Sequence, residues 1–115
     1  MNFTTNKQKG NPMYRQGDVL IVPVKSIPKS LTPVERENGL VILAHGEVTG
    51  HAHAIKSKHA VLFSDPQLMA TFMTVSDEPV ALEHEEHDTI TIPPGDYRVI
   101  RQREYHPEEI RRVED

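Results

Sequence analysis

Three histidines lie within nine residues of this chain, in the stretch HGEVTGHAHAI at 45–55. If residues 51–56 form a β-strand, His51 and His53 project from the same face, because alternate side chains of a strand point the same way. Their Cα atoms would lie about 6.5 Å apart, a span over which two imidazole nitrogens can reach one metal ion at about 2.0–2.1 Å. The H-x-H pair therefore predicts two ligands of a divalent metal.

A second stretch, LEHEEHD at 82–88, could supply the third ligand. If it stays extended, Leu82 and His84 share one face, Leu82 is expected in the core, and His87 on the other face is the better ligand. If HEEH turns tightly, His84 and His87 can converge instead. Nitrogen and oxygen ligands with an open position suit Zn, Mn, Fe or Ni. The candidate metal ligands are therefore His51, His53, His87 and His84.

Two residues beside the H-x-H pair could assist a metal. His45 could orient a ligand through a hydrogen bond. Glu47 could accept backbone N–H groups in the turn between Gly46 and Gly50, or act as a general base toward a metal-bound water. Such a water would support hydrolytic or oxidative chemistry. The sequence predicts a site here without predicting a reaction.

The composition narrows the class of protein. A chain of 115 residues can bury a core without disulfides, and the absence of cysteine leaves His, Asp and Glu as the available metal ligands. A formal net charge of −4 does not favour nucleic acid or an anionic membrane as a partner. There is no apolar run of transmembrane length, and MNFTTNKQKGNPM lacks the apolar stretch of a secretory signal, so we expect a cytoplasmic protein.

Short runs rich in Val, Ile and Thr, separated by Gly, Pro, Asn and Asp, are typical of a small all-β domain. We expect a disordered tail at 1–12 and, over 13–115, a single compact barrel or sandwich of about eight short antiparallel strands. Residues 25–37, with two prolines, predict a long surface loop. Ala52 and Ala54, opposite the histidines, predict that another backbone packs closely on their face. The predicted strands are 18–24, 40–45, 51–56, 60–65, 69–75, 80–85, 89–93 and 96–105.

The C-terminal segment YRVIRQREY at 97–105 indicates a different function. Strand alternation places three of its arginines and tyrosines, Arg101, Arg103 and Tyr105, on one face with Tyr97 and Val99. Arginine beside tyrosine can bind phosphate or stack on bases, although the nearby glutamates favour ion pairs within the sheet. The alternative function is therefore a non-catalytic regulatory module that docks a protein or an RNA through this face. Exposed sheet edges would also permit a homodimer.

Two resemblances accompany these patterns. Gly46 to His53 and IPPGDY at 92–97 resemble the two motifs of the cupins, which are small metal-binding β-barrels. Lysines and a serine at 56–58 stand where the cupin glutamate is expected, so this resemblance implies ligand roles only for His51 and His53. From YRQGDVLIVPV through HGEVTGHAH to PPGDYRVIRQREY, over residues 14–113, the chain is similar to a family of small uncharacterised bacterial proteins, which implies no activity.

Overall fold

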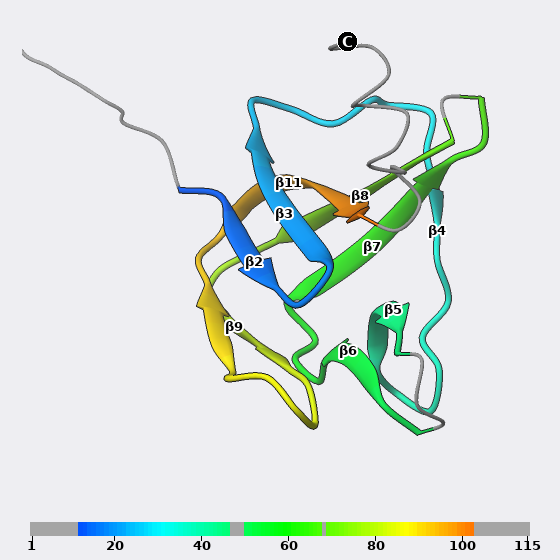
Figure 1. Ribbon diagram of the computed structural model, residues 1–115. Helices are drawn as coiled ribbons and strands as arrows, with labels where there is room; N and C mark the ends of the chain where they lie inside the picture. Colours follow the sequence, from blue (N-terminus) through cyan, green and yellow to red (C-terminus); the bar gives the residue numbers. More distant parts are fainter. Residues whose placement is uncertain (1–11, 47–49, 68, 103–115) are drawn as a thin grey trace, which may run out of the picture.

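The structure is a computed structural model that describes residues 12–46, 50–67 and 69–102. Every named element in these residues is a β-strand, and the strands form two antiparallel sheets (Figure 1). The larger sheet has, in order, β2 (Tyr14–Gln16), β3 (Val19–Val24), β11 (Gly95–Arg101), β8 (Ala70–Val75), β7 (Ala60–Asp65) and β4 (Thr32–Pro33). The smaller sheet has β10 (Ile90–Ile92), β9 (Val80–Glu83), β6 (Ala52–Ile55) and β5 (Val41–His45).

Alternating burial shows which face of each sheet is turned inward. In the larger sheet, Ile21 is fully buried opposite Val99 on β11. In the smaller sheet, Ile55 is fully buried opposite Leu82 on β9. All four side chains belong to one hydrophobic cluster, so the two sheets share a core.

The all-β prediction is confirmed, and the arrangement fits a sandwich. Of the two architectures expected from the sequence, the closed barrel is not adopted, because each sheet keeps two edge strands. In the described part of the chain there is no helix long and apolar enough to cross a membrane.

Each predicted strand overlaps an observed strand, and two short edge strands were not predicted. The strand β4 lies inside the segment 25–37 that was expected to be only loop, and its Pro33 is tolerated because β4 is an edge strand. The strand β2 is three residues long, too short to carry a recognisable alternation. Apart from Pro12, the expected tail lies outside the described residues, as does the predicted continuation of the last strand over 103–105.

A bulge in β5 makes room for a histidine between the sheets. The register between β5 and β6 runs from Val41 opposite Ile55 to Ala44 opposite His53, with an irregularity between Ile42 and Ala44. The extra residue brings the small side chain of Ala44 opposite His53, and both residues are buried. The bulge therefore allows an imidazole ring to replace an aliphatic residue on the inward face.

Candidate metal centre

Three imidazole rings gather where the smaller sheet meets the turn between β2 and β3. His53 lies on β6, and His84 and His87 lie in the connection between β9 and β10. The ring centroid of His84 lies 4.3 Å from that of His53 and 4.7 Å from that of His87. The centroids of His53 and His87 are 6.0 Å apart. Of the two alternatives left open by the sequence, the chain adopts the tight turn, which brings His84 and His87 together.

His51 lies at the outer edge of this cluster. It immediately precedes β6, and its ring meets the edge of His84 at a centroid distance of 5.9 Å. Its Nδ1 atom is 3.3 Å from a carboxylate oxygen of Glu86. The H-x-H pair thus places both rings around His84, with His53 on the buried side and His51 toward solvent.

A buried glutamine anchors the His53 ring. Gln16, at the end of β2, is 2% exposed, and its side-chain amide donates to the backbone carbonyls of Leu82 and Asp88, each at 2.9 Å. Its Oε1 atom lies 2.8 Å from Nδ1 of His53. One side chain from the larger sheet therefore holds β6, β9 and the β9–β10 connection of the smaller sheet.

The other ring nitrogen of His53 faces a carboxylate. Its Nε2 atom lies 3.5 Å from Oδ1 of Asp18, which follows Gly17 in the turn between β2 and β3. The second carboxylate oxygen of Asp18 accepts a 3.2 Å hydrogen bond from Nε of Arg101, at the end of β11. A second nitrogen of the Arg101 guanidinium donates to the backbone carbonyl of His45, which fixes the guanidinium in place.

Burial lowers the pKa of His53 from its ordinary 6.5 to about 4. Desolvation is the largest cause, followed by the nearby His84; Asp18 opposes the shift, while His87 and Arg101 add to it. His53 is therefore a neutral imidazole at neutral pH, which is the form in which histidine binds metal ions.

Glycine at position 17 leaves space for the rings. Its φ is +60°, a conformation that favours glycine, and a Cβ built there would lie 2.7 Å from Nε2 of His87 and 3.2 Å from Cε1 of His53. The His87 ring nitrogen thus points at the backbone immediately beside Asp18. Within the described ranges no group of three or more His, Asp or Glu side chains is already arranged to hold a metal ion.

Of the remaining predicted site residues, the structure describes His45 and Arg101. The exposed ring of His45 contacts Glu37 at 3.1 Å, so only its backbone carbonyl reaches the site, through Arg101. Glu47, Arg103 and Tyr105 are outside the described residues. Within β11, the face that carries Tyr97, Val99 and Arg101 turns inward, because Tyr97 is fully buried and the guanidinium of Arg101 is bound to Asp18.

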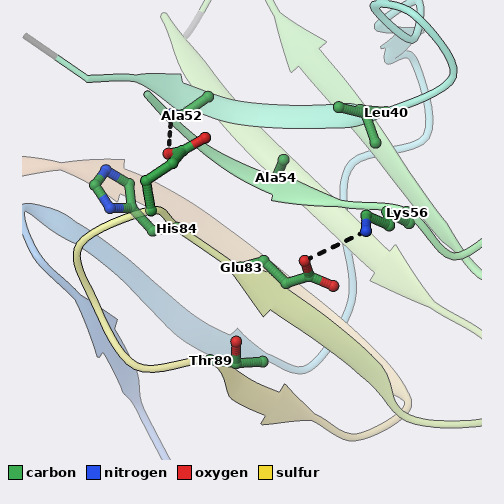
Figure 2. Close-up of a pocket in the computed structure, with 8 residues that line it drawn as sticks. Leu40, Ala52, Ala54, Lys56, Glu83, His84 and Thr89 are labelled. Atoms are coloured by element: carbon green, nitrogen blue, oxygen red, sulfur yellow. Dashed lines mark hydrogen bonds and ion pairs between the residues drawn. The ribbon is translucent and has the colours of Figure 1, made fainter. Parts of the chain in front are cut away.

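The alanine face of β6 is open rather than covered by another backbone. Ala52, Ala54 and His84 line a hollow of about 320 Å³ (Figure 2). The ring centroid of His84 lies 4.3 Å from that of His53. The ladder between β6 and β9 includes Ala54 but not Ala52, whose N–H is instead bound by the Glu85 carboxylate at 3.0 Å. This hydrogen bond lowers the pKa of Glu85. The expectation of close backbone packing on the alanines is therefore wrong.

Sequence reasoning missed Gln16 and Asp18. Both come from the β2–β3 hairpin, far along the chain from the histidines, and neither forms a motif with them in the sequence. Gln16 ends the short run YRQ and Asp18 follows Gly17, a pattern that predicts only an ordinary turn.

Comparison with known proteins places the chain in a family. The model of a family described as a domain of unknown function, DUF8820, matches residues 15–102. The match includes Gln16, Asp18 and Arg101 together with the clustered histidines. No curated protein and no solved structure matches the chain.

Proposed function

We propose that this chain, which belongs to the DUF8820 family of domains of unknown function, binds a divalent metal ion at its histidine cluster. The donors are imidazole nitrogens and a carboxylate oxygen, a set that suits Zn, Mn, Fe or Ni. In this proposal Asp18 joins the histidines as a ligand, and no thiolate takes part.

One observation carries the proposal, the 3.5 Å separation between His53 Nε2 and Asp18 Oδ1. Two ligand atoms at about 2.0–2.2 Å from a tetrahedral ion lie roughly 3.3–3.6 Å apart. His53 is neutral at neutral pH, so at that pH a cation between the two atoms needs to displace no proton from the ring. The pair therefore has the spacing and the protonation that a metal ion requires.

The third ligand comes from the connection between β9 and β10. His84 and His87 both lie beside His53, and His87 is exposed, so its side chain can turn toward His53 and Asp18 to supply the third ligand. Three protein ligands leave at least one position for water or a substrate, which is the arrangement of catalytic rather than structural metal sites. Arg101 holds Asp18 so that the Oδ1 atom faces His53.

The test is calorimetric titration of the metal-stripped protein with Zn²⁺ and, separately, with Mn²⁺, Ni²⁺ and anaerobic Fe²⁺. We expect one ion per chain for at least one of these metals, and at least about tenfold weaker binding in Asp18→Asn and in His53→Gln. His45→Gln and His59→Gln are matched controls, because these rings contact Glu37 and Asp77 away from the cluster.

Binding that is absent in the wild type for all four metals would reject the proposal. So would wild-type affinity in a folded Asp18→Asn protein, or an equal loss in the two control variants. Circular dichroism on each variant establishes that it is folded.

A further inference from the structure

We infer that the metal ligands are His53 Nε2, Asp18 Oδ1 and His87 Nε2, that His84 is not a ligand, and that Gln16 is the positioning residue that sets this choice. This inference rests on the proposed metal binding and goes beyond it, because it selects two of the four clustered histidines. The selection rests on hydrogen bonds that fix which ring nitrogen of His53 and of His84 carries a proton.

The Gln16 amide has only one orientation that satisfies its partners. Its nitrogen lies 2.9 Å from the carbonyl oxygens of Leu82 and Asp88, which accept hydrogen bonds and cannot donate them. The amide oxygen must therefore face His53, and an oxygen that only accepts requires a proton on His53 Nδ1, 2.8 Å away. A neutral ring with a proton on Nδ1 has its lone pair on Nε2, the atom that faces Asp18.

His84 is held in the opposite tautomer. The backbone N–H of Glu86 donates to Nδ1 of His84 at 3.0 Å, so this nitrogen carries the lone pair and, in the neutral ring, Nε2 carries the proton. Metal binding through Nε2 would need the proton to move to Nδ1, where it would oppose the Glu86 N–H. His84 therefore packs beside His53, with ring centroids 4.3 Å apart and ring planes tilted by 37°, rather than acting as a ligand.

His87 has no such constraint. Among the described residues, neither of its ring nitrogens has a hydrogen-bond partner, and Nε2 points at the backbone of Gly17, next to Asp18. Its ring is nearly parallel to that of His53, with an interplanar angle of 17°. Because imidazole lone pairs lie in the ring plane, the exposed His87 ring must turn from this parallel arrangement toward His53 Nε2 and Asp18 to share one ion with them.

The resulting donor set has two imidazole nitrogens and one carboxylate oxygen. Such a set with open positions is shared by non-haem Fe(II) sites and, as His₂Glu, by catalytic zinc sites. We therefore expect the site to retain exchangeable water when it is loaded with metal.

The first test needs no metal. Long-range ¹H–¹⁵N NMR spectra of the metal-free wild-type protein at neutral pH should show His53 protonated on Nδ1 and bare on Nε2, and His84 with the reverse pattern. A proton on His53 Nε2 would overturn the inference. Gln16→Leu removes the acceptor and should abolish the Nδ1–H preference of His53, whereas Gln16→Glu, which keeps an oxygen at this place, should retain it. A Gln16→Leu protein that keeps the wild-type tautomer would reject the role of Gln16.

The second test compares two exposed or partly exposed histidines of the same connection. With whichever metal the wild type binds, His87→Asn should weaken binding at least about tenfold, and His84→Asn should change it less than about threefold. The reverse order, or equal losses, would overturn the ligand assignment. A wild type that binds no metal but shows the stated tautomers would reject the proposed function and leave the assignment of ring protons intact, so the two failures are distinguishable.

Discussion

The side chains of Gln16 and His53 are joined by a 2.8 Å hydrogen bond that connects the two sheets of the sandwich. Both residues are buried. The three side-chain hydrogen bonds of Gln16 join it to His53, Leu82 and Asp88, which belong to the smaller sheet and its β9–β10 connection. This bond gives Gln16 two separable roles, one in stability and one in setting the proton position on His53.

Gln16→Leu should destabilise the fold by about 2–4 kcal/mol. The substitution leaves His53 Nδ1 and two backbone carbonyls without their partner, and each buried unpaired polar group costs about 1–3 kcal/mol, with partial compensation by water. Urea unfolding measures the loss. Gln67→Leu, at an exposed turn, should stay within about 0.5 kcal/mol of the wild type. Equal stabilities of the two variants would contradict the anchoring role.

The stability of the metal-free protein should fall between about pH 6.5 and pH 4. The folded pKa of His53 is lowered to about 4 while the unfolded value is near 6.5, so in this range the unfolded chain binds the extra proton. The contribution of neutral His53 is fully present above pH 6.5 and lost as the pH falls through this window, by up to about 3 kcal/mol.

Urea unfolding in the presence of a chelator, at intervals from pH 7.5 to pH 4, tests this dependence. His53→Gln cannot titrate and should show a flatter curve over the same range. A variant curve parallel to that of the wild type would show that other groups dominate.

Gly17→Ala should weaken metal binding in addition to destabilising the fold. Alanine at φ +60° costs about 1–2 kcal/mol, and its Cβ would lie 2.7 Å from Nε2 of His87, which must move away. Gly39→Ala is the matched control, because Gly39 has φ +80° and nothing within 4 Å of its Cβ position. Both variants should lose similar stability, and only Gly17→Ala should weaken metal binding. Unchanged metal affinity in Gly17→Ala would argue against His87 as a ligand.

Arg101→Gln should weaken metal binding several-fold with little change in fold. Without the guanidinium, Asp18 is free to rotate its Oδ1 atom away from His53. Arg98→Gln, on the exposed face of the same strand, is the control and should bind as the wild type does. If both variants retain full affinity, Arg101 does not position Asp18.

Much of the fold could be predicted from local sequence patterns. Strand alternation depends only on neighbouring residues, as for the buried Val19 and Ile21, and can be recognised in a single sequence. The same holds for turn residues such as Asn38 and Gly39, both of which have positive φ. The bulge opposite His53 and the strand β4 depend on which strands pair, which is set by contacts across the whole chain.

The site was only partly predictable for the same reason. Residue types and spacing predicted His53 and one or both of His84 and His87 in one place, and the observed proximity of all three rings is the alternative in which HEEH turns tightly. Asp18 and Gln16 contact His53 although they precede it by 35 and 37 residues in the sequence. Their roles depend on the packing of one sheet on the other, for which the sequence carries no motif.

Anomalous diffraction from crystals grown with the metal that the protein binds in solution tests directly whether His53 and Asp18 hold that metal. We expect one anomalous peak at about 2.0–2.2 Å from both His53 Nε2 and Asp18 Oδ1. Full occupancy of an ion elsewhere, for example on His45 or His59, with His53 and Asp18 in direct contact and free of metal, would contradict it.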